Sequence, residues 1–277
     1  MVHGAVSAHR AGTSTDRIVF LGHATVLIEL DGVRLLTDPL LRDHVAHLRR
    51  QVPPLEPAVY AGIDAVLISH LHHDHLDLAS LRLLGLEIPL LVPAGAGELL
   101  RGHGFSDVTE LRARERANVG ALAVTAVQAR HDGRRRPGPR GLSAATLGYV
   151  VSGRRRTVYF AGDTELFDGM SEVRSTPERG EESGQSPRPD VALLPVAGWG
   201  PTLGAGHMDP LDAARAARLI GPRIAIPMHW GTLLPIGLAG RHGRRLGDPP
   251  RIFAEHVASL APDVEVRILQ PGQETTL

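Results

Sequence analysis

The chain has 277 residues, enough for a sizeable hydrophobic core, and its 43% hydrophobic and 22% charged residues are typical of a soluble globular protein. Its 30 basic and 30 acidic residues cancel, so no net charge draws the protein as a whole toward nucleic acid or an anionic membrane. It contains no cysteine, which excludes disulfides, thiolate ligands and cysteine nucleophiles and leaves histidines and carboxylates to bind any metal.

The N-terminus has the composition of a tail and not of a targeting segment. Residues 1–16 contain no apolar core of signal-peptide length, and no later stretch approaches the roughly 20 apolar residues of a membrane span. We therefore expect a flexible tail over residues 1–16, no integral membrane segment and a cytoplasmic location.

The first part of the chain has the pattern of an antiparallel sheet followed by a buried strand and a helix. Three β-rich runs come first, at residues 17–21, 25–30 and 33–37. Asp31-Gly32 between the last two runs is a strong hairpin signal. An apolar run at 64–69 has the length of a buried strand, and residues 76–86 have helical apolar spacing.

The second part repeats this plan. A hairpin at 147–151 and 157–161 leads to an apolar run at 190–194 and a helix at 210–220. Asp64 follows the end of the first hairpin, Asp38, by 26 residues, and Asp190 follows Asp163 by 27. Chance similarity of short apolar runs is the alternative.

We infer one α/β (α+β) domain over residues 17–277, with two similar halves. The two sheets would pack face to face with helices outside, as a four-layer αββα sandwich. Residues 174–189, rich in Glu, Ser, Gly and Pro, are expected to be a surface insertion.

The stretch SHLHHDHLD, residues 69–77, comes directly out of the first buried run and holds four histidines and two aspartates. Histidines two apart on an extended segment point the same way, so His70 and His72 can bind one cation. Asp74 and His75, beyond the bend, would face a second cation. A random His-x-His-x-Asp-His pattern is expected on the order of a few times per thousand such chains. A solvated surface turn is the alternative, but delivery by a buried strand favours a site for two adjacent metals.

Three more strand ends carry a histidine or an aspartate. His131 follows the apolar run at 122–127, Asp163 ends the second hairpin, and His229 ends the run at 223–228. Each alone is better explained as a structural or solvated residue. Their shared placement makes them candidate ligands of the same site.

Together these features resemble the metallo-β-lactamase fold hydrolases, from about residue 18 to about residue 269. The resemblance rests on Thr37-Asp38-Pro39, the His-x-His-x-Asp-His box, His131, Gly162-Asp163-Thr164 and His229. Within the family, the segments GHATVLI, SHLHHDHLD, AGDT and MHWGT are most similar to the branch with ascorbate-6-phosphate lactonase and the N-acyl-phosphatidylethanolamine phospholipase D enzymes. The resemblance implies the same αββα sandwich.

The resemblance also implies a ligand set for two divalent ions. One ion would be bound by His70, His72 and His131, the other by Asp74, His75 and His229, with Asp163 bridging them. These ligand types suit Zn²⁺, our first choice, and also Mn²⁺ or Fe. Two cations about 3.5 to 4 Å apart lower the pKa of a bridging water toward about 7, which makes a metal-bridging hydroxide the expected nucleophile. Asp74 would act as a catalytic residue by accepting a hydrogen bond from it.

Two residues are expected just outside the ligands. Asp38 would accept a hydrogen bond from a ligand imidazole and fix its tautomer, unless it is only a turn aspartate before Pro39. His23 presents the same choice.

His207 lies in the second-half loop that corresponds to the metal-binding loop, so we expect it to contact the substrate or protonate the leaving group. A histidine that merely flanks a helix start is the alternative for His207.

Aromatic and basic residues near these loops are open to two interpretations. Trp199 could wall the pocket, although core packing is the simpler interpretation of both Trp199 and Trp230. The arginines at 134–136 flank His131 and could bind a substrate phosphate. A solvated run of charges is the ordinary alternative.

The leading hypothesis is a binuclear metal-dependent hydrolase, of phosphodiesterase or lactonase type, that cleaves a small anionic phosphodiester, ester or lactone. A nuclease of the same fold is less favoured, because the chain has zero net charge and no broad basic face. A metal- or ligand-binding protein without turnover is the alternative from another class. We expect a small-molecule partner and no nucleic acid.

Overall fold

The computed structural model describes residues 15–135, 142–176, 188–198, 203–237 and 247–277. The tail expected over residues 1–16 lies outside the described residues up to residue 14. Of the insertion expected at 174–189, residues 177–187 also lie outside them, as do Trp199 and Arg136.

The first sheet contains the predicted N-terminal hairpin and has the strand order β17-β1-β2-β3-β6-β7-β8. Its strands are β1 (Arg17–Gly22), β2 (Thr25–Leu30), β3 (Val33–Thr37), β6 (Ala65–Leu67), β7 (Leu90–Pro93), β8 (Val108–Leu111) and β17 (Glu274–Thr276). The β1-β2-β3 strands are antiparallel, whereas β3, β6, β7 and β8 are parallel.

The second sheet repeats this arrangement, with the order β16-β14-β13-β12-β11-β10-β9. Its strands are β9 (Arg116–Val119), β10 (Leu122–Gln128), β11 (Leu147–Ser152), β12 (Thr157–Phe160), β13 (Val191–Pro195), β14 (Ile224–Met228) and β16 (Glu265–Val266). Strands β10-β11-β12 are antiparallel, and β12, β13 and β14 are parallel. The repeated plan inferred from the hairpin spacings is therefore present in the fold.

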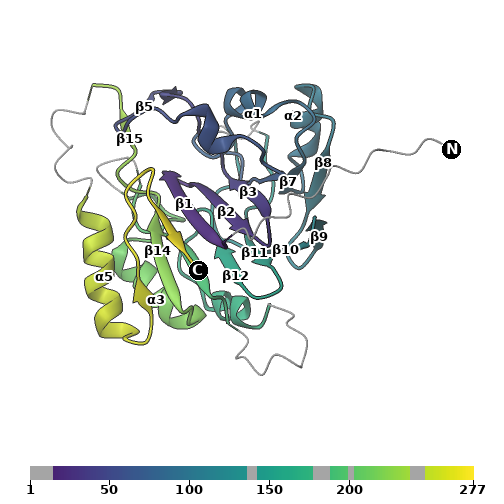
Figure 1. The fold of residues 1–277 in the computed structure, drawn as a ribbon. Coiled ribbons are helices and arrows are strands. Elements are labelled where there is room, and N and C mark those ends of the chain that lie inside the picture. The colour runs from purple at the N-terminus through teal and green to yellow at the C-terminus, as the bar shows by residue number, and fades with distance from the viewer. Residues whose placement is uncertain (1–14, 136–141, 177–187, 199–202, 238–246) are drawn as a thin grey trace.

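Helices cover the outer face of each sheet (Figure 1). They are α1 (Leu78–Leu84), α2 (Gly97–Gly102), α3 (Pro210–Ile220) and α5 (Asp248–Leu260), with shorter 3₁₀ turns at Pro57–Tyr60 and Asp168–Ser175. One buried cluster, with Phe105 and Leu81, joins α1 and α2 to the first sheet. The larger cluster joins the two sheets and includes Phe253 of α5. The result is the predicted αββα sandwich.

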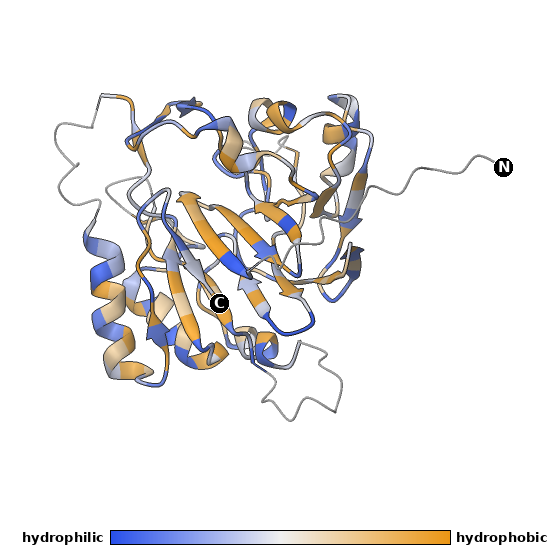
Figure 2. Ribbon diagram, in the orientation of Figure 1, coloured by the Kyte–Doolittle hydropathy of each residue, from blue (hydrophilic) through white to orange (hydrophobic). Residues whose placement is uncertain are grey.

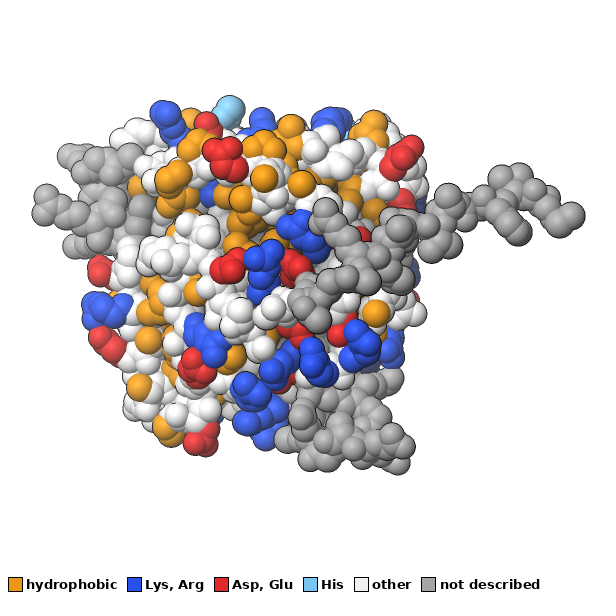
Figure 3. Space-filling model, in the orientation of Figure 1, with side chains coloured by type: hydrophobic (Ala, Val, Ile, Leu, Met, Phe, Trp, Pro, Cys, Tyr) orange, Lys and Arg blue, Asp and Glu red, His pale blue; other side chains and the backbone are white. Residues whose placement is uncertain are grey.

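Strand composition explains these layers. The parallel strands β6, β7, β13 and β14 are buried along their whole length, as strands covered on both faces must be. Figure 2 shows hydrophobic residues along strands such as β1, β2 and β14, and more hydrophilic residues on the helices and loops around them. Figure 3 shows the face of the molecule seen in Figure 1, where arginine side chains lie with acidic side chains beside them, consistent with a net charge of zero.

The predicted helix at 76–86 is shorter in the structure because both ends are capped. The side chain of Asp77 accepts a hydrogen bond from the Ser80 amide and starts α1 at Leu78. Gly85, with φ of 105°, ends it. The helix predicted at 210–220 has the bounds observed for α3, where Asp209 is the N-cap and Gly221 the left-handed C-cap.

A third small sheet was not predicted. It pairs β15 (Leu233–Pro235) with β5 (Leu48–Arg50) and β4 (His44–Val45). These strands are two or three residues long and are held by a separate apolar cluster that includes Leu48 and Leu233. Among the described residues, no helix has the length and hydrophobicity to cross a membrane.

Candidate metal centre

The loop that follows β6 places the SHLHHDHLD residues at one edge of the first sheet. Leu71 and Leu76 are fully buried and anchor the loop on both sides of the bend. The amides of His75 and Leu76 both donate to the carbonyl of His72, at 3.1 and 2.8 Å. This tight turn brings Asp74 and His75 back toward the histidines before the bend.

The first donor cluster consists of His70, His72 and His131. Nδ1 of His72 lies 2.9 Å from Nε2 of His70 and 3.0 Å from Nε2 of His131. Two imidazole nitrogens bound at about 2.1 Å to one tetrahedral ion lie about 3.4 Å apart, so this spacing is close to that of ligands on one cation. His131 comes from the end of β10, as its sequence position suggested.

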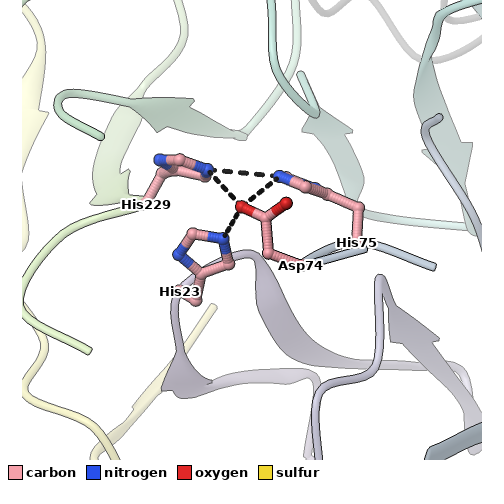
Figure 4. A group of neighbouring side chains, drawn as sticks. All are labelled: His23, Asp74, His75 and His229. Atoms are coloured by element: carbon pink, nitrogen blue, oxygen red, sulfur yellow. Dashed lines mark hydrogen bonds and ion pairs between the residues drawn. The ribbon is translucent and has the colours of Figure 1, made fainter. Parts of the chain in front are cut away.

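The second cluster consists of His23, Asp74, His75 and His229, all buried (Figure 4). Nε2 of His75 lies 3.2 Å from Nε2 of His229. Oδ2 of Asp74 lies 3.7 Å from the first of these nitrogens and 3.9 Å from the second. The structure therefore brings these side chains together from the N-terminal hairpin, the loop after β6 and the end of β14.

Asp163 stands between the two clusters. Its Oδ2 lies 3.2 Å from Nε2 of His75 and 3.2 Å from Nε2 of His229, and Asp163 also groups with His131 of the other cluster. Its Oδ1 is buried and has no hydrogen-bond partner among the described residues. A buried carboxylate oxygen without a donor is costly, so this atom is suited to a cation.

Hydrogen bonds from four Nδ1 atoms leave four Nε2 atoms free to bind. Nδ1 of His75 donates to Asp38 at 2.7 Å, and Nδ1 of His70 donates to Ser69 Oγ at 2.9 Å. Nδ1 of His131 donates to the Gly206 carbonyl and Nδ1 of His229 to the Ala197 carbonyl, each at 2.8 Å. The four acceptors hold the four rings in the tautomer whose Nε2 lone pair faces the cluster.

Ser69 and Thr232 contribute contacts that the sequence analysis missed. Ser69 donates through its amide and its Oγ to the Asp38 carboxylate, at 2.7 and 2.5 Å. It so connects Asp38 to residues 69–77, the proposed metal loop. Oγ1 of Thr232 accepts from the His23 amide at 2.7 Å. The only available signal was position, since Ser69 directly precedes His70 and Thr232 follows His229 by three residues.

His23 contacts two members of its cluster. Its Nε2 lies 3.0 Å from Oδ2 of Asp74, and its carbonyl accepts from the His229 amide at 2.8 Å. Its ring centroid is 3.9 Å from that of His229. His23 has φ of 57°, a conformation that costs a residue with a side chain about 1 kcal/mol or more.

His207 lies at the rim of the clusters. Its Nε2 is 3.5 Å from Oδ2 of Asp163, and its side chain is 22% exposed. Nδ1 donates to the Gly204 carbonyl at 3.1 Å, which leaves Nε2 facing inward. Burial would lower the pKa of His207, but the hydrogen bond and the charge of Asp163 raise it above the ordinary value.

The aromatic and basic residues named from the sequence take separate positions. Trp230 is buried, donates to the Pro227 carbonyl at 2.9 Å and stacks on Phe20, so it is a core residue. Arg134 is exposed, with Nε 3.8 Å from Asp132. Arg135 points back at the loop after β6 and donates to two of its backbone carbonyls.

Burial and neighbouring charges set the protonation states of the site. Burial lowers the pKa of His131 to about 4, so this imidazole is neutral near pH 7. Burial alone would raise the pKa of Asp163, but His229 and His75 hold it well below its usual range. Burial would lower the pKa of His75, yet Asp163 and Asp74 raise it well above the usual value.

A cation fits the donors of both clusters and the protonation states of His131 and Asp163. Neutral imidazole nitrogens and ionised carboxylates are the forms that bind divalent metals. A cation at the second cluster would compete with the proton for Nε2 of His75, because both are attracted by the same carboxylates. The clusters therefore have the donor types, spacing and charge that a metal ion needs.

Comparison with known proteins places the chain in a family. The beta-lactamase superfamily domain matches residues 33–230, more than half of the chain. A metal-dependent hydrolase of Methanopyrus kandleri is 35% identical over 260 residues, covering 93% of this chain and 98% of that protein. The N-acyl-phosphatidylethanolamine-hydrolyzing phospholipase D 1 of Caenorhabditis elegans is 31% identical over 242 residues, covering 79% of this chain and 64% of that enzyme. The chain spans 61% of the length of an uncharacterized protein of Mycobacterium tuberculosis, to which it is 33% identical.

A solved structure supports the same architecture. Igni18, described as a novel metallo hydrolase from the archaeon Ignicoccus hospitalis, matches with a TM-score of 0.71 and 23% identity, covering 95% of this chain and 99% of that one. At this identity the likeness shows the fold alone. The domain match and the relative from Methanopyrus kandleri identify this chain as a member of the metallo-β-lactamase superfamily of metal-dependent hydrolases.

Proposed function

We propose that the protein is a binuclear metal-dependent hydrolase that cleaves a small anionic phosphodiester, with ester or lactone cleavage as the alternative chemistry of the same site. The observation that carries this proposal is the pair of donor clusters that share Asp163. In this proposal, His70, His72 and His131 would hold one ion, for which zinc is our first choice. Asp74, His75 and His229 would hold the other, and Asp163 would contribute to both groups.

Two such cations supply an activated water with a pKa near about 7 and a charge that stabilises the attacked group. The protein orients the groups around this water. The hydrogen bonds that Nδ1 of the ligand histidines donates hold their rings, so that no reorientation is needed during reaction. Asp74, with Oδ2 fixed by Nε2 of His23 at 3.0 Å, would accept a hydrogen bond from the attacking water and orient it. Asp38 keeps His75 in the tautomer that presents Nε2.

We assign to His207 the protonation of the leaving group of the substrate. Its side chain is partly exposed beside Asp163, and Nε2 faces the clusters. A proton donor at the rim can protonate the oxygen that departs as the bond breaks. Its hydrogen bond to the Gly204 carbonyl keeps the ring oriented for that transfer.

The choice of a phosphodiester is supported by one relative and by the charge of the site. The relative from Caenorhabditis elegans carries a phospholipase D name and is 31% identical over 79% of this chain. Two divalent cations would bring four positive charges to the three carboxylates of Asp38, Asp74 and Asp163, and the remaining positive charge would suit a phosphodiester anion better than a neutral ester.

The test compares three substrate classes under identical conditions. Purified protein loaded with Zn²⁺ or Mn²⁺ is assayed with bis(p-nitrophenyl) phosphate, a simple lactone and p-nitrophenyl acetate. His72→Ala is the inactive variant, and His103→Ala is its matched control, since His103 lies exposed at the end of α2. We expect phosphodiester turnover that His72→Ala abolishes and His103→Ala retains.

Two other results would change the proposal. Turnover of the lactone or the carboxylic ester alone would move the assignment to that chemistry while keeping the metal centre. Stoichiometric metal binding without turnover of any class would contradict hydrolysis and favour a protein that binds its ligand without reaction.

A further inference from the structure

The metal loop is irregular backbone that must stay in place. It carries His72, Asp74 and His75 between β6 and α1, and these residues belong to neither element. Its carbonyl oxygens need donors to remain buried. The turn at His72 supplies part of the internal bonding, through the amides of His75 and Leu76.

Arg135 supplies two further bonds from outside the loop. Its Nη1 donates to the carbonyl of Leu71 at 2.9 Å and to the carbonyl of Leu76 at 2.9 Å. These two carbonyls bracket the ligand-bearing residues 72–75. One guanidinium nitrogen therefore joins the two ends of the loop, and charged donors make stronger hydrogen bonds than neutral ones.

Backbone hydrogen bonds hold Arg135 close to His131, another of the proposed ligands. It lies four residues after His131, in a short antiparallel ribbon. Its amide donates to the Leu142 carbonyl at 2.8 Å, and the Ala144 amide donates to the Gly133 carbonyl at 3.1 Å. A Cβ at position 133 would lie 2.0 Å from the Ala144 carbonyl oxygen, so the close approach requires glycine there.

The ribbon is also tied to the backbone of the ligand. Oγ1 of Thr146 donates to the His131 carbonyl at 3.1 Å. The amide of Leu147 donates to the Ser69 carbonyl at 3.0 Å, so the chain that returns from the ribbon meets the start of the metal loop. His131 and the 72–75 segment are thus joined by a continuous set of hydrogen bonds, with Arg135 as the side-chain link.

We infer that Arg135 is a positioning residue that holds the metal loop and the His131 segment at the separation that the first donor cluster needs. It acts through the carbonyls of Leu71 and Leu76 and not on the reacting atoms. The inference rests on the proposed ligand set but not on the substrate. Arg135 therefore sets metal affinity, and its side chain has a structural use that differs from the phosphate contact considered for the arginines at 134–136.

The test compares Arg135→Met with Arg134→Met. Methionine keeps an apolar stem without donors. Arg134 is the matched neighbour because, within the part of the chain that the structure describes, its exposed guanidinium has an ion pair only with Asp132. The measurement is the zinc dissociation constant, obtained by competition with a chromophoric chelator, together with the melting temperature of the metal-free protein. We expect Arg135→Met to weaken zinc binding by about 10- to 100-fold, as loss of contacts behind metal ligands typically does, and Arg134→Met to leave it within about twofold.

Arg135→Lys separates positioning from general stability. Its ammonium retains the charge and can donate to one or both carbonyls, so we expect it to recover part of the lost affinity. This variant also carries the test if Arg135→Met does not fold. A wild-type zinc dissociation constant in Arg135→Met, or a lowered melting temperature with unchanged affinity, would overturn the inference.

The experiment also distinguishes this inference from the proposed function. If the wild-type protein binds zinc but cleaves none of the three substrates, the proposed function fails while the affinity comparison at Arg135 still decides the positioning role.

Discussion

The site loops of the two halves of the molecule share one local arrangement, a histidine followed by a buried apolar residue and a helix N-cap. In the first half, His75 is followed by buried Leu76 and by Asp77, the N-cap of α1. In the second half, His207 is followed by buried Met208 and then by the N-cap of α3. Each histidine thus enters the site two residues before a capping aspartate.

The two loops differ in what surrounds that histidine. The first loop is rich in donors, and His75 is 0% exposed between carboxylates. The second loop is rich in glycine and leaves His207 22% exposed at the rim. The Gly206 carbonyl of this loop accepts from the ligand candidate His131. Under the proposed function, the first loop would bind metal, while the second would support a ligand and face the substrate.

Removing a donor from the first loop should have the largest effect. We expect His72→Ala to lower kcat/KM by at least about 10³-fold, because its Nδ1 is the atom that meets both other imidazoles of its cluster. Metal content should fall from two ions per chain, as measured by plasma mass spectrometry. Full metal content together with lost activity would contradict the assignment of His72 as a ligand.

Removing the histidine of the second loop should affect catalysis without affecting the metal. We expect His207→Ala to lower kcat by about 10²-fold, the lower range for loss of a general acid, with metal content unchanged. Substrates with a better leaving group should lose less, because they need less protonation. Unchanged kcat/KM in this variant would show that the role is wrong.

The glycines of the second loop allow a finer test. Gly206 has φ of 80°, and a Cβ there would lie 2.8 Å from Nδ1 of His131, so Gly206→Ala should disturb that ligand. We expect destabilisation of about 1 to 2 kcal/mol and weaker zinc binding. Gly204→Ala is the control, since its Cβ would lie 3.8 Å from His207 in ordinary contact. Equal zinc affinities in the two variants would argue against support of His131 by this loop.

The capping aspartates lie outside the donor clusters and should have the smallest effects on the site, but their effects on stability should differ between the loops. Asp209→Ala should cost about 1 kcal/mol in the free energy of unfolding, as loss of an N-cap does. Asp77→Ala should cost more, about 2 kcal/mol, because Asp77 also accepts from Arg42 at 2.8 and 2.9 Å and from Ser80 Oγ at 2.7 Å.

The contribution of Asp77 should depend on pH. Burial would raise the pKa of Asp77, but the hydrogen bonds of Arg42 and Ser80 lower it below the ordinary value. A lowered pKa in the folded state means that the stabilisation is fully present above about pH 4, the unfolded value, and is lost as the pH falls through the folded value. The difference in melting temperature between wild type and Asp77→Ala should therefore shrink from pH 7 toward pH 2. A constant difference over this range would contradict the role of the ionised carboxylate.

Local sequence pattern predicted much of the site. The six-residue box supplies four of the proposed ligands, because the alternation of a strand and a following bend is encoded within a few residues. The strand-end positions of His131, Asp163 and His229 followed from the hydrophobic runs before them, which reach the same edge of the sheets. The resemblance to a known family assigned these residues to two ions.

Other parts of the site depend on contacts between distant segments. Oδ2 of Asp74 meets His23, which is 51 residues away, and the His23 amide meets Thr232, which is 209 residues away. His23, Asp38 and His229 all have positive φ, which no pattern of residue types predicts for residues other than glycine. The three-stranded sheet of β4, β5 and β15 was missed for a similar reason, since its strands are too short for a period to be recognised.

The sequence by itself therefore determined the strands and helices that lead into the site, the repeated halves and the types of donor, because hydrophobic periodicity, caps and the metal box act over a few residues. Only the tertiary structure decided which side chains stand behind the donors. The bonds of Ser69 to Asp38, of His23 to Asp74 and of Arg135 to the metal loop span 31, 51 and 59 to 64 residues. Such bonds form only when packing of the two sheets brings their partners within hydrogen-bond distance.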